Sequence, residues 1–481
     1  MYHTTTATGS STTEYGDLRP RPPNLLILGA SGQVAQAVLR RLPGFRDQFG
    51  KLVLLDHNDF VVSNPFLDHV RLDYRFIRRV LQLPEDEAAY LRLLREHQID
   101  VVLDLTDLGT LPVLRATDAA GVSYVNTALN DPKAGVTDVL SQILPVTLAP
   151  CRAPHIVSSG MNPGAVNIWV WHGSIHYGPP QDIVHFEYDT SMPETGWKPL
   201  VTWSRQEFLA EIVREPTGCV VDGEPRLLEG PAIQHREEMR SILEPVMPLR
   251  SYPRGFLVLH EENLQLGRKL GASSKYLYAI HPNTMDHLYA LWRERGVVDI
   301  EDLALGDNTS VPLVGADTIG VCLDYPGARV YYLHRLANKN VHGTNATCAQ
   351  VAMGVEAALR TLLAEDLAPR LHFATDLYHT VYADIIFQQL PVAHFVFQKQ
   401  AKTLMLTRHV PRMLRRLPSE AAPWTARTEA RGRSAVTTRF PVGTNRIAAG
   451  PKHAVYNGQT SPEKRRLAKT PAWVREKELA R

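Results

Sequence analysis

Long apolar runs are absent from this sequence of 481 residues: no uninterrupted hydrophobic stretch reaches the ~18 residues of a membrane-spanning helix. Cysteine is scarce. The four cysteines (Cys151, Cys219, Cys322 and Cys348) are scattered and form no CxxC pair, which argues against structural zinc and against a disulfide framework. The first 17 residues have neither a basic start nor an apolar centre, so they do not match a secretory signal. We therefore expect a cytoplasmic protein with reduced thiols, and neither a membrane partner nor a bound metal.

Charge is nearly balanced overall but unevenly distributed. The net charge is +2, yet residues 401–481 carry 18 Lys and Arg against 5 Asp and Glu, a balance of +13 that leaves −11 for the first 400 residues. An acidic body suits a cationic ligand, whereas a basic tail suits a polyanion or that same body. We do not expect nucleic acid as a partner, although the basic tail leaves that open.

The stretch from Asn24 to Arg41 predicts a phosphate-binding turn. Leu25–Leu28 form a short apolar run, which is typical of a strand buried on both faces. Gly29, Gly32 and Ala35 follow, in a variant of the dinucleotide-binding fingerprint that opens a helix. Glycines let the backbone approach a phosphate, and the helix N-terminus favours the negative charge.

The next predicted strand favours NAD as the dinucleotide. Residues 51–55 are largely apolar and end at Asp56, which lies 27 residues after Gly29. A carboxylate at this position can accept hydrogen bonds from a ribose 2′-hydroxyl and would repel a 2′-phosphate. The alternative is a β–α–β unit in which Asp56 only caps a loop.

The following residues continue the alternation of strands and helices. We predict strands at residues 101–106, 123–127 and 156–159, and helices at residues 84–97, 110–120 and 165–171. This alternation indicates an α/β fold with a Rossmann-type doubly wound parallel sheet, whose ligands bind at the carboxyl ends of the strands. A second glycine turn, Gly160–Gly164, enters the last of these helices. The residues expected to bind NAD are Gly29, Ser31, Gly32, Gln33, Val34, Asp56, Thr106, Asn126, Thr127 and Asn162.

Changes in sequence character predict five segments. Beyond residue 173 we predict strands at residues 183–188 and 254–260 and a helix at residues 206–213. The alternating pattern of these strands favours an α+β substrate domain built on an open sheet. The expected segments are a flexible tail (1–22), an NAD-binding domain (23–173) completed by a helix at 345–365, a substrate and oligomerisation domain (174–338), a helical return segment (339–400) and a basic mobile tail (401–481).

The predicted substrate domain contains several acidic and aromatic residues, among them Glu187, Trp203 and Glu211, with His260 and Glu262 farther along the chain. A ligand with terminal ammonium groups requires carboxylates at its ends and benefits from an indole face beside a cationic nitrogen. Each residue also has a structural alternative. The tryptophan could be core, the histidine could be a hydrogen-bonded residue of an apolar strand, and Glu211 could lie on an exposed helix face.

The order of these motifs resembles bacterial homospermidine synthase, within the saccharopine dehydrogenase-like group. The similarity extends from about Asn24 to Glu365. The segments that carry it are Gly160–Gly164, Glu187–Thr190, Thr202–Ser204 with Glu211, Gly255–Glu262, Tyr278–Pro282, Asp317–Val321 and Asn345–Thr347. The sequence departs from the family pattern at Gly29–Gly32, at Asn126 and at Glu261.

The resemblance implies a reaction and a site. NAD would be held almost as a prosthetic group while putrescine is oxidised to an imine, a second amine displaces ammonia, and the new imine is reduced to homospermidine. Trp203 would stack on a cationic nitrogen, Glu187 and Glu211 would bind ammonium groups, and His260 with Glu262 would manage protons near the reacting carbon. Asn162 completes the expected catalytic set, and the resemblance further implies a diamine or polyamine substrate and a homodimer.

Two alternatives come from other functional classes. A related saccharopine or carboxynorspermidine reductase would couple an amine to an aldehyde that carries a carboxylate. Such a substrate calls for an Arg or Lys in the site, and Arg254 and Arg268 are the nearest in the sequence. The second alternative is a non-catalytic NAD-binding scaffold whose basic tail binds a polyanion.

Overall fold

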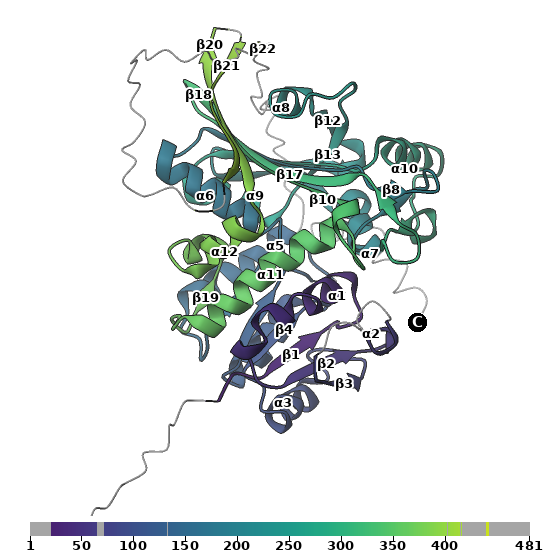
Figure 1. Ribbon diagram of the computed structural model, residues 1–481, viewed down its shortest axis with the longest axis vertical. Coiled ribbons are helices and arrows are strands. Elements are labelled where there is room, and N and C mark those ends of the chain that lie inside the picture. Colours follow the sequence, from purple (N-terminus) through teal and green to yellow (C-terminus); the bar gives the residue numbers. More distant parts are fainter. Residues whose placement is uncertain are drawn as a thin grey trace, which may run out of the picture. The chain divides into compact units, whose positions relative to one another are not determined.

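A parallel seven-stranded sheet forms the N-terminal part of the protein in the computed structural model (Figure 1). The structure describes residues 21–64, 72–131, 133–401, 403–413 and 415, together with the backbone of residues 439–441. Most of the two tails expected at residues 1–22 and 401–481 therefore lies outside the described residues. Among the residues that are described, no helix is long and apolar enough to cross a membrane.

The first sheet has the strand order β19-β6-β5-β4-β1-β2-β3, and all of its pairs are parallel. Strands β1 to β6 thus follow the 3-2-1-4-5-6 order of doubly wound dinucleotide-binding folds, which confirms the predicted fold class. The strands are β1 (Leu25–Leu28), β2 (Leu52–Asp56), β3 (Tyr74–Arg78), β4 (Val101–Asp104), β5 (Ser123–Asn126), β6 (His155–Ile156) and β19 (Leu371–His372).

Helices follow the strands of this sheet, as the alternating pattern predicts. The first helix begins directly after Gly32, and a 3₁₀ segment that contains Pro43 follows it. The helices of this part are α1 (Gln33–Leu39), α2 (Phe60–Ser63), α3 (Glu87–Glu96), α4 (Thr110–Ala119), α5 (Val136–Ile143) and α6 (Ala165–Tyr177).

A second, mixed sheet of eleven strands carries the rest of the described chain. Its order is β11-β10-β14-β7-β17-β18-β20-β21-β22, and β12 and β13 are attached beside β14. The strands β14 and β7 pair in parallel, whereas the other pairs are antiparallel. The strands are β7 (Asp182–Asp189), β10 (Pro216–Val221), β11 (Glu224–Pro231), β12 (Arg236–Glu238), β13 (Arg254–Val258), β14 (Ser273–Ala279), β17 (Ala316–Asp324), β18 (Ala328–Ala337), β20 (Val392–Gln400), β21 (Thr403–Met413) and β22 (Arg439–Pro441).

Shorter pieces and further helices complete the fold. Two small sheets pair β8 (Met192–Pro193) with β16 (Leu313–Val314) and β9 (Leu200–Val201) with β15 (Ala304–Leu305). The remaining helices are α7 (Arg205–Leu209), α8 (Arg240–Leu243), α9 (Glu261–Leu270), α10 (Pro282–Arg295), α11 (Ala346–Ala364) and α12 (Val381–Gln389).

The helix expected at residues 206–213 is present as α7 followed directly by a π-helical turn, Ala210–Arg214. Two other expectations about local structure were wrong. The strand expected to include His260 ends at Val258, because the backbone N–H of His260 donates to the Asn263 carbonyl oxygen Oδ1 at 3.1 Å and caps α9. The tail expected to start at residue 401 begins with β21, whose apolar Leu404 is buried against the sheet.

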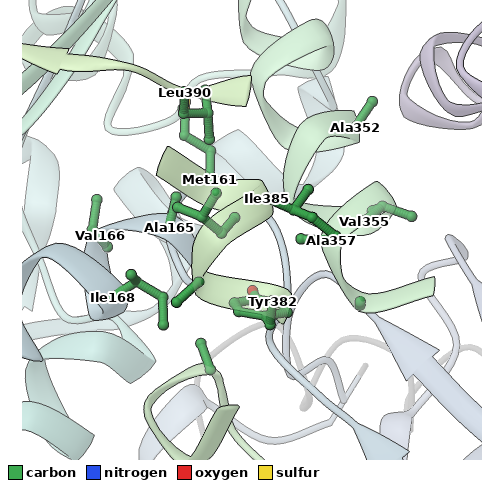
Figure 2. Packing of buried hydrophobic residues seen from close by; sticks show 14 of the residues in the cluster. Met161, Ala165, Val166, Ile168, Ala352, Val355, Ala357, Tyr382, Ile385 and Leu390 are labelled. Carbon is green, nitrogen blue, oxygen red and sulfur yellow. The ribbon is translucent and has the colours of Figure 1, made fainter. Parts of the chain in front are cut away.

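Helix α11 connects the two parts of the chain. It packs against α1 and β5 of the first sheet and against β17 and β18 of the second (Figure 1). Figure 2 shows the buried side chains around α12, with Met161 from the turn before α6, Ala165 from the start of α6, and Val355 from α11. Because residues from both sheets join one apolar core, the described residues hold together as a single compact unit.

A close backbone contact fixes α11 against the Gly160–Gly164 turn. A Cβ atom placed on Gly354 would lie 2.1 Å from the Gly160 carbonyl oxygen. We predict that Gly354→Ala lowers the free energy of unfolding by about 2 kcal/mol. An overpacking cost near 3 kcal/mol against rigid backbone exceeds the ~1 kcal/mol that Ala gains over Gly in helix propensity. Chemical denaturation measures this, with Gly44→Ala as the control because its Cβ would meet nothing within 4 Å. Equal stability of the two variants would contradict the prediction.

Candidate functional site

A cavity of about 120 Å³ lies between the two sheets, where the loops at one edge of the parallel sheet meet the second sheet. Five of the six residues expected to be catalytic line it together. Its lining residues are Val34, Thr127, Ala128, Gly160, Met161, Asn162, Glu187, Trp203, Glu211, His260, Tyr276, Tyr278, Thr347 and Val351. The sixth expected residue, Glu262, lies behind His260 and contacts its ring.

The turn before α6 directs Asn162 into this cavity. The turn is closed by a hydrogen bond from the Gly160 N–H to the Pro163 carbonyl at 2.8 Å. Gly164 has φ 125°, and a Cβ there would lie 2.3 Å from the Gly160 carbonyl oxygen, so only glycine fits. The Asn162 amide Nδ2 then donates to Glu187 Oε2 at 3.0 Å and to the Tyr276 hydroxyl at 2.6 Å.

Glu187 is a buried carboxyl group with a strongly raised pKa. It lies on β7 and is only 3% exposed, and it accepts a hydrogen bond from the Tyr276 hydroxyl at 2.7 Å. Burial raises its pKa to about 8, and the charge of nearby Asp189 adds to this, against the opposing effect of the hydrogen bonds from Tyr276 and Asn162. At neutral pH the group is therefore mostly protonated unless a cation lies beside it.

Two further buried acids lie near Glu187, one on the same strand and one on the neighbouring strand β17. Asp189 follows on the same face of β7 and accepts hydrogen bonds from the Thr202 hydroxyl and the Ser191 N–H, both at 2.8 Å. Asp317 is the cross-strand partner of Asp189 on β17, and Gln350 of α11 donates to it at 2.9 Å. Burial raises the pKa of both carboxyl groups, and for Asp317 the charges of Glu187 and Asp189 raise it further.

His260 is surrounded by three glutamates. Its Nδ1 lies 2.5 Å from Glu262 Oε2 and 3.4 Å from Glu261 Oε2, while its Nε2 lies 3.5 Å from Glu211 Oε1. Burial by itself would lower the pKa of His260, but the charges of Glu262 and Glu261 and the contact with Glu211 raise it well above the ordinary value. Burial would likewise raise the pKa of Glu262, yet the His260 charge lowers it. The ring is thus held as an imidazolium.

Trp203 forms part of the cavity wall at the start of α7. Its indole Nε1 donates to the Tyr278 hydroxyl at 3.1 Å. The backbone carbonyl of the preceding residue, Thr202, accepts a hydrogen bond from the Asn345 amide at the start of α11. The indole therefore has both a fixed orientation and a place beside the carboxyl groups.

Sequence reasoning missed two acids near this site. Glu207 and Glu215 stand four residues on either side of Glu211, a spacing that was readable as one helix face. Burial, followed by the charge of Glu211, raises the pKa of each to about 7. The cavity and its surroundings are therefore rich in carboxyl groups.

Lysine and arginine do not line this cavity among the described residues, and His260 is its one titratable base. The two arginines nearest in sequence lie elsewhere. Arg254 is exposed on β13 and donates to the Arg236 carbonyl, and Arg268 is exposed near the C-terminal end of α9.

The residues expected to bind a dinucleotide lie at the carboxyl ends of β1, β2, β4 and β5. Gly29 has φ 73°, and a Cβ there would lie 2.6 Å from the Leu105 carbonyl oxygen. Asp56 accepts hydrogen bonds from the backbone N–H groups of Ser31 at 2.9 Å and Asn58 at 3.0 Å. It therefore does cap the glycine loop, as the structural alternative predicts, and it also stands at the tip of β2.

Other expected cofactor residues have partners within the protein. The side chain of Asn126 accepts from the Ser158 N–H at 2.9 Å and donates to the Ala128 carbonyl at 2.6 Å. The Thr106 hydroxyl donates to Asp104 Oδ1 at 2.6 Å. Both side chains brace loops at the sheet edge, whereas Val34, Thr127 and Asn162 reach the cavity.

Two clusters within the described residues could offer three metal ligands. In the first, Asp118, Cys151 and His155, the Tyr124 N–H donates to His155 Nδ1 at 3.1 Å. The ring proton is therefore on Nε2, which lies 2.9 Å from Asp118 and is not free for a metal. The second cluster is His260, Glu261 and Glu262, where a proton shared with the carboxylates fills the position between them.

Comparison with known proteins identifies a shared fold. No family model and no curated protein matches this chain. The solved homospermidine synthase from Legionella pneumophila, in complex with NAD, is 15% identical over 77% of this chain and 91% of that one, with a TM-score of 0.62. An amine dehydrogenase from Mycobacterium smegmatis is 10% identical over 74% of this chain and 95% of that one, and its TM-score of 0.34 is too low to support an argument. This chain thus shares its fold with the homospermidine synthase from Legionella pneumophila.

Proposed function

We propose that this protein is an NAD-dependent enzyme that acts on diamines in the manner of homospermidine synthase. The aminobutyl group of putrescine is transferred to a second amine with release of ammonia, and homospermidine is the product. The observation that carries this proposal is the single cavity lined by Asn162, Glu187, Trp203, Glu211 and His260, at the edge of a dinucleotide-type sheet. A homodimer stays a prediction.

The charges of the cavity favour a dication. One imidazolium is opposed by several carboxyl groups, and Glu187 can ionise once an ammonium group lies beside it. A carboxylate-bearing substrate of the reductase type would find no Lys or Arg among the described lining residues, and the His260 imidazolium is already contacted by three glutamates. An indole face next to the carboxyl groups suits a cationic nitrogen.

The residues at the sheet edge fit NAD. Gly32, the N-cap residue of α1, makes no side-chain cap, so the first-turn N–H groups can approach a pyrophosphate. The Asp56 carboxylate accepts hydrogen bonds from two N–H groups of the loop. Because a carboxylate can accept about four hydrogen bonds, it can still accept hydrogen bonds from the hydroxyl groups of a ribose. NAD, when bound, accepts a hydride from an amine carbon and can return it to an imine.

The chain's own residues hold the amine and move its protons. Glu187, oriented by Asn162 and Tyr276, binds one ammonium group, and Glu211 binds another. His260 has its Nδ1 fixed by Glu262, so its Nε2 faces Glu211 and can give a proton to the departing ammonia. Before that step, the incoming ammonium group gives a proton to Glu211 so that the neutral amine can attack the imine carbon, and Glu211 afterwards returns this proton to His260. Trp203 supplies a rigid π face and displaces water.

The first test is the product. The protein incubated with putrescine and catalytic NAD should form homospermidine and ammonia without net NADH, because oxidation and reduction occur in one cycle. Mass spectrometry identifies the product, and absorbance follows NADH. A stoichiometric rise of NADH with free aldehyde would mark a plain amine dehydrogenase, and no consumption of putrescine would favour the scaffold alternative.

The second prediction concerns cofactor choice. NAD should bind at least tenfold more tightly than NADP, because a 2′-phosphate would meet the Asp56 carboxylate. Asp56→Asn should narrow this ratio, since it keeps the size of the side chain and removes its charge. Exposed Asp59→Asn is the matched control. Calorimetry measures both affinities, and equal binding of NAD and NADP by the unmodified protein would refute the assignment.

The third prediction follows from the pKa of Glu187, raised to about 8. Below pH 8 the Glu187 carboxyl group is protonated, so it must lose a proton when an ammonium group binds. Above pH 8 the carboxyl group is already ionised, and no proton is released. Putrescine affinity should therefore rise with pH from 6.5 to 8.5, by up to about tenfold per unit, while amines with pKa near 10 stay charged.

Glu187→Gln should remove much of this slope and weaken putrescine binding more at pH 8.5 than at pH 6.5. Exposed Glu294→Gln of α10 is the control, and it should keep the full slope. Calorimetric titration with NAD present provides the data. An unchanged slope in Glu187→Gln would show that another group governs the ammonium site.

A further inference from the structure

A second and larger cavity lies beside the C-terminal half of α9, away from His260 at the start of that helix. Its volume is about 470 Å³, within the ~300–1,000 Å³ of small-molecule sites. It shares no lining residue with the catalytic cavity. Its walls come from α5, the β10–β11 turn, α9 and the segment after β19, and comprise Thr137, Leu140, Ser141, Leu144, Thr147, Gly223, Glu224, Pro225, Leu264, Gln265, Leu266, Arg268, Lys269, Arg370, Phe373, Thr375 and Asp376.

The walls of this cavity are largely apolar. The apolar residues of the lining are Leu140, Leu144, Pro225, Leu264, Leu266 and Phe373. An apolar ligand body would therefore gain free energy by leaving water for this cavity.

The charged residues of this cavity leave a positive surplus. Asp376 lies 3.4 Å from Lys269 Nζ and 3.9 Å from an Arg370 nitrogen, so its charge is already opposed by two cations. Arg268 has no ion-pair partner among the described residues, and Glu224 is the other acid of the lining. The catalytic cavity has the opposite character.

We propose that this second cavity binds an apolar molecule with a terminal carboxylate, which the Arg268 side of the cavity receives. The apolar walls account for the body of the ligand, and the surplus of positive charge in the lining accounts for its anionic end. A diamine would not suit this cavity, because its ammonium groups would meet arginines and leave the apolar walls unfilled. The assignment does not depend on the proposed reaction.

Sodium decanoate is the probe, titrated calorimetrically into the full-length protein, with decanol and decylamine as neutral and cationic matches. We expect decanoate to bind one site, at least tenfold more tightly than decanol or decylamine. Leu144→Trp, in the 3₁₀ turn after α5, should fill the cavity and abolish binding, whereas Gln142→Trp, exposed near the end of α5, should not. Arg268→Gln should weaken binding at least fivefold, and the exposed Arg293→Gln of α10 should leave it unchanged.

Melting curves of each variant exclude misfolding, and Thr147→Trp replaces Leu144→Trp if the latter does not fold. Decanoate that does not bind, or that binds equally well to the cavity-filling variant, overturns the proposal. Preference for decanol or decylamine overturns the assignment of an anion. Complete competition, in which saturating putrescine abolishes decanoate binding, would place the decanoate in the catalytic cavity and would also overturn the proposal.

Discussion

Three carboxyl groups buried on one face of two neighbouring strands set the requirements that the surrounding structure meets. A carboxyl group without partners is costly to bury, so each one draws a donor from a different part of the chain. Glu187 receives Tyr276 from β14 and Asn162 from the turn before α6, Asp189 receives Thr202 from the approach to α7, and Asp317 receives Gln350 from α11. The acids therefore fix the positions of the elements that enclose the cavity.

The same requirement explains why the return of the chain through α11 matters. This helix supplies the donor to Asp317, its N-cap Asn345 holds the carbonyl before Trp203, and Gly354 allows it to touch the Asn162 turn. Its other side packs against α1, directly behind the glycine loop. One helix thereby sets the distance between the residues suited to a dinucleotide and those suited to an amine.

Local features of the sequence were enough to predict the central strands of the parallel sheet, which are short apolar runs followed by polar residues, as at Leu25–Leu28 and Val101–Asp104. The strands β3, which is partly exposed, and β19, which has two residues, were not predicted. The resemblance to a known family supplied the candidate site residues, five of which line one cavity. The pairing of Asp189 with Asp317 could not be read from the sequence, because it depends on the register of two strands more than a hundred residues apart. The capping role of His260 was readable from Asn263 and the acids that follow it, and was missed. The second cavity could not be predicted from the sequence, because it depends on how α5 and α9 pack and no local sequence pattern determines that packing.

Gln265 stands between the two cavities. Its oxygen accepts from Asn167 Nδ2 at 3.5 Å, and Asn167 Oδ1 accepts from the Gly164 N–H at 2.9 Å, in the turn that carries Asn162. A ligand that orients this amide from one side therefore acts on the residue that orients Glu187 on the other. Thermodynamic linkage makes such an effect reciprocal: the factor by which an occupant of the larger cavity changes amine affinity equals the factor by which the amine changes the affinity for that occupant. The amide of one glutamine would then convert two separate binding equilibria into a coupled pair.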